Sequence, residues 1–156
     1  VHMIKLKSLL KSLAISLGVG LLASLLSMNF MNQYMKLYLP KAAPDASVFP
    51  LVWTILYILM GVSSYIIYES DSPLKEIALK VYVIQLAINF AWPLIFFNAQ
   101  AYLFAFVWIL LLWLMIILMI YLFFKISPIA AYLQIPYFLW VTFATYLTFS
   151  VYLLNR

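Results

Sequence analysis

The chain has 156 residues, of which 69% are hydrophobic and only 8% are charged. Apolar residues make up roughly half of an ordinary water-soluble domain, and a chain of this size cannot bury such an excess in its own interior. The composition therefore excludes a water-soluble domain and predicts an all-α integral membrane protein. The net charge of +5 comes from a few basic residues at segment ends, so no nucleic-acid partner is predicted.

Charged residues divide the chain into long uncharged windows, at 12–35, 46–68, 81–124 and 126–155. A membrane-spanning helix needs about 20 apolar residues, so the third window is long enough for two helices that fold back near its most polar point, Asn98 to Gln100. We therefore predict a single domain, 1–156, that is a bundle of five transmembrane helices in the lipid bilayer. The predicted helices cover residues 8–28, 50–69, 74–97, 101–124 and 128–153, and a long loop covers 29–49.

The distribution of basic residues predicts the orientation in the membrane. Five spans place the two termini on opposite sides, with six basic residues on the side of the N-terminus and three on the side of the long loop. Because cytoplasmic loops carry the excess of lysine and arginine, we expect the N-terminus in the cytoplasm and the C-terminus outside. The first residues, Val-His-Met, resemble a cloning remnant, and without them the chain has no histidine.

The residue types needed for acid–base or metal chemistry are missing from the predicted spans. The carboxylates all lie in loops or at helix ends, and the chain has no cysteine. A metal site, an axial haem ligand and a base beside a hydroxyl nucleophile are therefore not predicted, and no cofactor is expected. Ion-coupled transport is also disfavoured, because such transporters place ionisable groups within their spans.

Aromatic residues make up 19% of the chain, and several share a helix face with a polar or small side chain. Residues three or four positions apart lie on the same face of a helix. By this spacing the predicted faces are Trp53 and Tyr57; Gln85, Asn89, Trp92 and Phe96; and Trp140, Ala144 and Leu147. Tryptophan near the end of a span is also typical of the interfacial belt, so a belt and a pocket remain alternative interpretations of these indoles.

The stretch "NFAWPLIFF" places Asn89 and Pro93 together within a span. An amide in hydrocarbon must find a partner, and that partner is either another helix or a ligand. Pro93 lacks a backbone donor and leaves the carbonyl of Asn89 without its usual partner. A bend beside an amide favours the interpretation as a cavity wall, with Trp92 and Phe96 on the same wall.

The first predicted helix and the loop after it each have two interpretations. The helix carries small residues at helical spacing, which favours close packing either within the bundle or in a homodimer. These residues are Ala14 and Gly18 on one face and Ser16, Gly20 and Ser24 on another. The loop and the residue that follows it contain three prolines, Pro40, Pro44 and Pro50. Each proline fixes φ, so we expect a semi-rigid segment that is either a lid or a plain connector.

Three motifs, "FPLVWTILYILMG", "NFAWPLIFF" and "PYFLWVTFATYL", resemble in their order and spacing the tryptophan-rich sensory protein (TspO/MBR) family, whose mitochondrial members are called translocator protein or peripheral benzodiazepine receptor. The resemblance covers nearly the whole chain, and the usage of lysine and asparagine suggests a bacterial member in a bacterial cell membrane. It implies a five-helix bundle, often a homodimer. It also implies ligands such as protoporphyrin IX and haem, sterols in animals, and synthetic isoquinoline carboxamides.

The resemblance implies a ligand site that opens toward the long loop. Its residues would be Pro44, Phe49, Trp53, Tyr57, Asn89, Trp92, Trp140 and Ala144. Two departures bear on this site: the family usually has a tryptophan shortly before the "FP" of the loop, where this chain has Ser47, and a leucine-asparagine pair where this chain has Leu147-Thr148. The first departure bears on loop contacts with a ligand, and the second weakens the case for a sterol.

From these residues and the family resemblance, we expect a membrane protein that binds a tetrapyrrole. Bacterial members of the family have been linked to light-dependent breakdown of protoporphyrin IX, for which Trp53 and Trp140 are the expected catalytic residues. The alternatives are a transporter of porphyrins or sterol-like ligands and a membrane stress-response scaffold.

Overall fold

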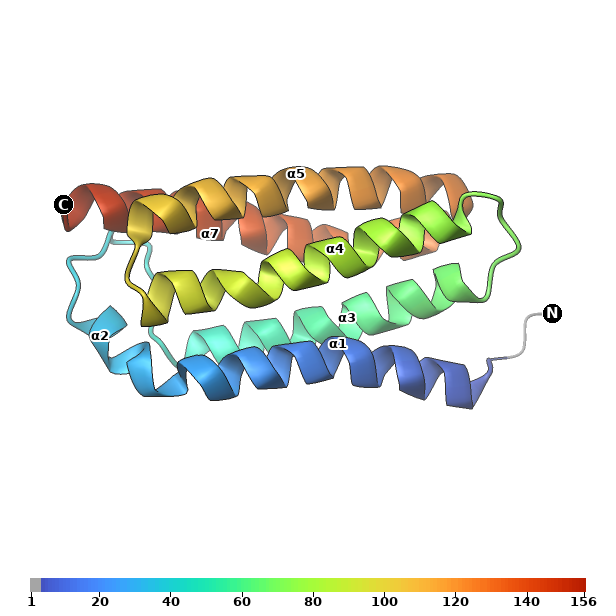
Figure 1. Cartoon of the computed structure of the whole chain (residues 1–156), viewed down its shortest axis with the longest axis horizontal. Coiled ribbons are helices and arrows are strands. Elements are labelled where there is room, and N and C mark those ends of the chain that lie inside the picture. Colours follow the sequence, from blue (N-terminus) through green and yellow to red (C-terminus); the bar gives the residue numbers. More distant parts are fainter. Residues whose placement is uncertain (1–3) are drawn as a thin grey trace.

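The computed structural model describes residues 4–156. The first three residues, on which the prediction of a cloning remnant falls, lie outside the described residues. Within 4–156 the elements are helices, and five helical segments are long and apolar enough to cross a membrane. The prediction of an all-α membrane bundle is confirmed (Figure 1). The spans are Leu6–Met35, Val48–Tyr68, Lys75–Asn98, Tyr102–Ile126 and Pro128–Leu154.

The first span continues beyond its predicted end at residue 28. Helix α1 (Leu6–Ser27) passes through the 3₁₀ turn η1 (Met28–Phe30) into the short helix α2 (Met31–Met35). Tyr34 explains the difference, because its side chain is buried and packs edge-on against Phe49, with ring centroids 5.2 Å apart. This tertiary contact outweighs the low helix propensity of the neighbouring asparagines. The loop is shortened to residues 36–47.

The third span contains a change of helix type at its proline. Helix α3 (Val48–Tyr68) is followed by α4 (Lys75–Pro93), which leads directly into the π-helical turn η2 (Leu94–Asn98). The backbone N–H of Ala99 donates to the carbonyl of Leu94 at 2.9 Å, five residues back. Proline lacks an N–H and interrupts the regular ladder, and the wider turn follows it. The chain then reverses at residues 99–101.

The last predicted helix is two helices in the structure. Helix α5 (Tyr102–Ile126) is followed by α6 (Pro128–Tyr132) and α7 (Ile135–Leu154). Pro136 stands in the first turn of α7. It has no N–H to donate to the preceding turn, which favours the break in the helix between α6 and α7.

The helices pack so that one end of the bundle gathers most of the aromatic side chains named above. Helix α1 packs mainly against α3, α4 packs against α1, α3 and α5, and α7 packs against α5. The C-terminal ends of α1, α4 and α7 and the N-terminal ends of α3 and α5 lie at the same end as the 36–47 loop (Figure 1). We call this the loop end of the bundle.

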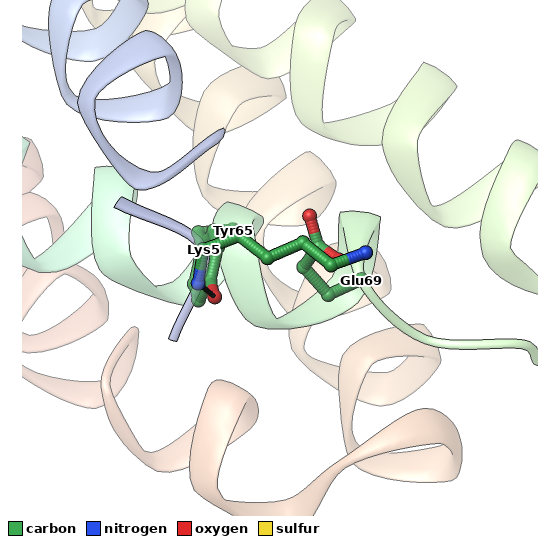
Figure 2. A network of polar contacts seen from close by, with 3 residues as sticks. All are labelled: Lys5, Tyr65 and Glu69. Carbon is green, nitrogen blue, oxygen red and sulfur yellow. Dashed lines mark hydrogen bonds and ion pairs between the residues drawn. The ribbon is translucent and has the colours of Figure 1, made fainter. Parts of the chain in front are cut away.

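At the opposite end, the start of α1 is attached to the end of α3. The backbone N–H of Lys5 donates to the hydroxyl of Tyr65 at 2.8 Å, and Nζ of Lys5 lies 3.2 Å from Oε2 of Glu69 (Figure 2). The side chain of Lys5 is 70% exposed, so this ion pair contributes about 1 kcal/mol at most. This is the end for which the basic residues predict the cytoplasm.

Candidate ligand-binding site

A cavity of about 130 Å³ lies at the loop end between α1, α3 and α4. Helix α1 lines it with small residues, which include Gly20, Ala23 and Ser24. Helices α3 and α4 line it with larger and mostly aromatic side chains. These are Phe49, Trp53 and Tyr57 from α3 and Asn89 and Trp92 from α4. The small residues of α1 therefore leave a space that faces an aromatic wall.

Helices α1 and α3 approach each other closely at Gly20. A Cβ at this position would collide with the ring of Tyr57. One turn earlier, Oγ of Ser16 donates to the backbone carbonyl of Tyr57 at 2.7 Å. The face with Ser16 and Gly20 thus packs within the bundle, which was one of its two interpretations. The other face, with Ala14 and Gly18, is exposed.

Asn89 lies at the centre of a buried hydrogen-bond chain across three helices. The hydroxyl of Tyr57 donates to Oδ1 of Asn89 at 2.5 Å, and Nδ2 of Asn89 donates to the hydroxyl of Tyr137 at 2.7 Å. The hydroxyl of Tyr137 donates in turn to Oε1 of Gln85 at 2.6 Å. Interhelical bonding, the first interpretation of Asn89, is therefore present. Because Asn89 also lines the cavity, these hydrogen bonds hold the aromatic wall in place.

Trp92 lines the cavity and carries a hydrogen-bond donor without a partner within the described residues. Its side chain is 3% exposed, and within residues 4–156 its Nε1 has no hydrogen-bond partner. A buried N–H without a partner costs roughly 1–3 kcal/mol, and an acceptor on a ligand would recover this cost. Trp92 is thus a candidate hydrogen-bond donor for a molecule in the cavity.

Phe96 does not line the cavity. Its ring stacks on that of Trp92, with centroids 5.0 Å apart, and so lies behind the aromatic wall. Phe97 lines it instead. In an α-helix the residue four positions after Trp92 shares its face. The π-helical turn inserts one further residue, and the residue five positions later takes that place.

Trp53 connects the cavity to Trp140, although Trp140 does not line it. The ring centroid of Trp53 lies 5.7 Å from that of Tyr57 and 6.4 Å from that of Trp140. Trp140 instead lines a separate apolar groove between α3 and α7. Ala144 is buried in the core. The structure thus brings Trp53 and Tyr57 to the cavity and leaves Trp140 and Ala144 behind them.

Three interlocked rings lie beside the cavity at the loop end. Tyr34 packs against Phe49 and Phe97 with centroids 5.2 and 5.9 Å away, and Phe49 and Phe97 also lie 5.9 Å apart. The hydroxyl of Tyr34 donates to the carbonyl of Pro44 at 3.0 Å, and this is how Pro44 contributes, since it does not line the cavity. We call Tyr34, Phe49 and Phe97 the ring cluster.

A second attachment ties the loop to the end of α7. The backbone N–H of Tyr38 donates to Oδ1 of Asn155 at 3.0 Å, and Nδ2 of Asn155 donates to the carbonyl of Tyr38 at 2.9 Å. Lys36 and Lys41 of the same loop are exposed. Within residues 4–156, no group of His, Cys, Asp and Glu is arranged to hold a metal ion. The site therefore offers stacking, shape and a few hydrogen bonds.

Sequence reasoning missed the residues of α1 that line the cavity, together with Tyr34, Phe97 and Tyr137. The spacing of small residues in α1 was the available signal, but we interpreted it as packing alone. Tyr34 stands in a polar stretch that indicated a loop. Tyr137 carries no signal of its own, because only the fold brings it to Asn89.

The fold and the cavity define a polytopic helical membrane protein with an aromatic-walled internal site at one end. The chain belongs to the TspO/MBR family, whose model matches residues 12–154, and the predicted family is confirmed. It is 39% identical over 110 residues to the tryptophan-rich protein TspO of Chlorobaculum tepidum. The matched residues make up 69% of this chain and 70% of that protein. It is 36% identical over 104 residues to the translocator protein of Homo sapiens, covering 65% and 62%.

Proposed function

We propose that this protein binds a tetrapyrrole, such as protoporphyrin IX or haem, in the cavity between α1, α3 and α4. The observation that carries the proposal is a cavity with aromatic walls, one of which, Trp92, has a buried indole N–H without a partner within residues 4–156. A porphyrin is flat and apolar, so it stacks on aromatic faces such as Trp53. Its two carboxylates would remain at the membrane surface, where Lys36 and Lys41 are exposed.

The cavity must widen to hold such a ligand. Sites for drug-sized ligands have volumes of about 300–1,000 Å³, whereas this cavity measures about 130 Å³. Widening is easiest where side chains rather than backbone form the wall, so Trp53, whose side chain is only partly buried, is the residue we expect to move. Binding should therefore change the environment of Trp53 and its fluorescence.

A second candidate function is light-dependent breakdown of the bound porphyrin. The observation that favours it is the run of neighbouring rings Tyr57, Trp53 and Trp140. An excited porphyrin can pass its energy to dissolved oxygen or take an electron from a nearby indole, and neither step needs an acid or a base. Trp53 and Trp140 are the residues that would take part.

A homodimer is part of the same proposal. Helix α1 is the least covered span, since only 11% of its most apolar window is buried within the bundle. A membrane helix with so little contact inside its own chain is available for contact with a second copy, through exposed residues outside the cavity such as Leu22 and Leu26. The cytoplasmic position of the N-terminus also remains a prediction, based on the basic residues alone.

The test is a titration with protoporphyrin IX in detergent, followed by quenching of tryptophan fluorescence in the dark and then under light. We expect saturable binding in the dark that Trp53→Phe and Trp92→Phe weaken. The matched control is Trp113→Phe on α5, whose indole donates to Thr142 at 2.8 Å and does not line the cavity. Loss of porphyrin under light that disappears in Trp53→Phe would support the photochemical function. Absence of saturable binding would refute the tetrapyrrole proposal and favour the scaffold alternative.

A further inference from the structure

A groove of about 400 Å³ runs along the outside of the bundle between α1 and α3, next to the cavity. The two spaces share lining residues from both helices, namely Gly20, Ser24, Pro50, Trp53 and Tyr57. The groove continues past the cavity along Gly18, Leu21 and Thr54, all of which are exposed on the surface of the bundle. The cavity therefore adjoins a groove on the face of the protein that lies in the bilayer.

Glycines on α1, which have no side chain, help to form this groove. A Cβ at Gly18 would meet no atom within 4 Å, so the surface beside it is open. Gly20 lies two residues further along, where the helix meets the ring of Tyr57. The aromatic side chains that wall the cavity, Trp53 and Tyr57, therefore also form the wall of the groove.

At the loop end, several contacts hold together the segments beside the cavity. The ring cluster stands at the loop end, and the Tyr34 hydroxyl is bonded to the loop. Two hydrogen bonds between Tyr38 and Asn155 attach the same loop to α7. A ligand that came through the loop would have to break these contacts, whereas a ligand in the groove already touches the side of Trp53.

We propose that the groove between α1 and α3 is the entrance through which a flat, amphiphilic ligand dissolved in the bilayer reaches the cavity. This inference rests on the proposed function, since it takes a porphyrin as the ligand. An apolar ring that slides from lipid along Trp53 and Tyr57 never exposes its faces to water, which would cost about 25 cal/mol for each Å² exposed. Its carboxylates stay near the membrane surface because the cavity lies at the loop end.

The test measures the rates of association and dissociation of protoporphyrin IX in lipid vesicles that contain the full chain. Gly18→Phe places a large side chain beside the groove at a position where its Cβ meets no clash. Ala14→Phe is the matched control, because Ala14 lies on the same exposed face one turn away but does not line the groove. A third variant, Tyr34→Phe, removes the hydrogen bond that holds the loop.

We expect Gly18→Phe to slow association and dissociation together, by roughly tenfold or about 1.4 kcal/mol in each barrier, and to leave the Kd within about twofold. Ala14→Phe and Tyr34→Phe should leave both rates unchanged. Unaltered rates in Gly18→Phe would overturn the inference, and so would faster association in Tyr34→Phe, which would place the entrance at the loop.

Two further outcomes would also overturn the inference. If Ala14→Phe slows binding as much as Gly18→Phe does, the face is a contact between copies and not an entrance. If Gly18→Phe raises the Kd by changing dissociation alone, the groove is part of the resting site. Saturable binding by the unmodified chain separates these results from failure of the proposed function, because without it there is no rate to compare.

Discussion

Gly18 and Gly20 make a matched pair that tests how closely α1 and α3 pack. Both residues lie in α1, two positions apart, and each can be replaced by alanine. At Gly18 the added Cβ enters open space, so the change should be neutral or slightly stabilising, since alanine favours a helix over glycine by up to about 1 kcal/mol. At Gly20 the same Cβ collides with the ring of Tyr57.

The loss of stability expected for Gly20→Ala depends on the contacts that fix the ring of Tyr57. Tyr57 is 4% exposed, and its hydroxyl donates to Asn89, so the ring cannot move aside without losing that bond. Overpacking of a core costs about 1–3 kcal/mol, and a buried hydroxyl without its partner costs about 1–3 kcal/mol. Helix propensity cancels between the two variants. We therefore expect Gly20→Ala to be less stable than Gly18→Ala by about 2 kcal/mol or more.

The assay is reversible unfolding by sodium dodecyl sulfate in mixed micelles, followed by tryptophan fluorescence and by circular dichroism. The two variants are compared with the unmodified chain at the same detergent composition. Equal unfolding free energies for Gly18→Ala and Gly20→Ala, within about 0.5 kcal/mol, would show that the helices do not meet as described. A loss of stability at Gly18 alone would contradict the assignment of the two faces of α1, because its Cβ meets open space.

Three other changes have expected outcomes in the same unfolding assay. Gly61→Ala should destabilise the fold by about 1–3 kcal/mol, because its Cβ would lie 3.0 Å from a backbone atom of α1, at Leu13; stability equal to the unmodified chain would refute that close approach. Asn89→Leu should cost about 1–3 kcal/mol, because it removes the acceptor of the Tyr57 hydroxyl. Glu69→Gln should change stability by about 1 kcal/mol or less, because the ion pair with Lys5 is largely exposed, and a larger loss would contradict this.

The spans were predictable because lipid imposes a length and a composition on each of them. A run of about 20 apolar residues has few alternatives to a membrane helix, and the reversal at residues 99–101 follows from the polar residues in an otherwise apolar window. The aromatic wall was predictable for the same kind of reason. Trp53 and Tyr57 share a helix face by spacing alone, and the structure places both at the cavity.

The remaining features depend on contacts between distant parts of the chain or on a local change of helix type. The extension of the first span depends on Tyr34 meeting Phe49. The partner of Asn89 on α7, Tyr137, lies 48 positions further along the chain. Phe97 rather than Phe96 lines the cavity because of a π-helical turn, which the spacing rule for an α-helix cannot predict.

The central proposal is that the cavity between α1, α3 and α4 binds a porphyrin, and one measurement tests it most directly. The Kd of protoporphyrin IX is measured from porphyrin fluorescence in lipid nanodiscs for the unmodified chain, Ser24→Phe and Leu25→Phe. Both residues are exposed at the surface of α1, but Ser24 lines the cavity and its neighbour Leu25 does not. We predict that Ser24→Phe weakens binding about tenfold or more, which is about 1.4 kcal/mol, and that Leu25→Phe leaves the Kd unchanged. The same Kd for all three proteins would contradict the proposed site.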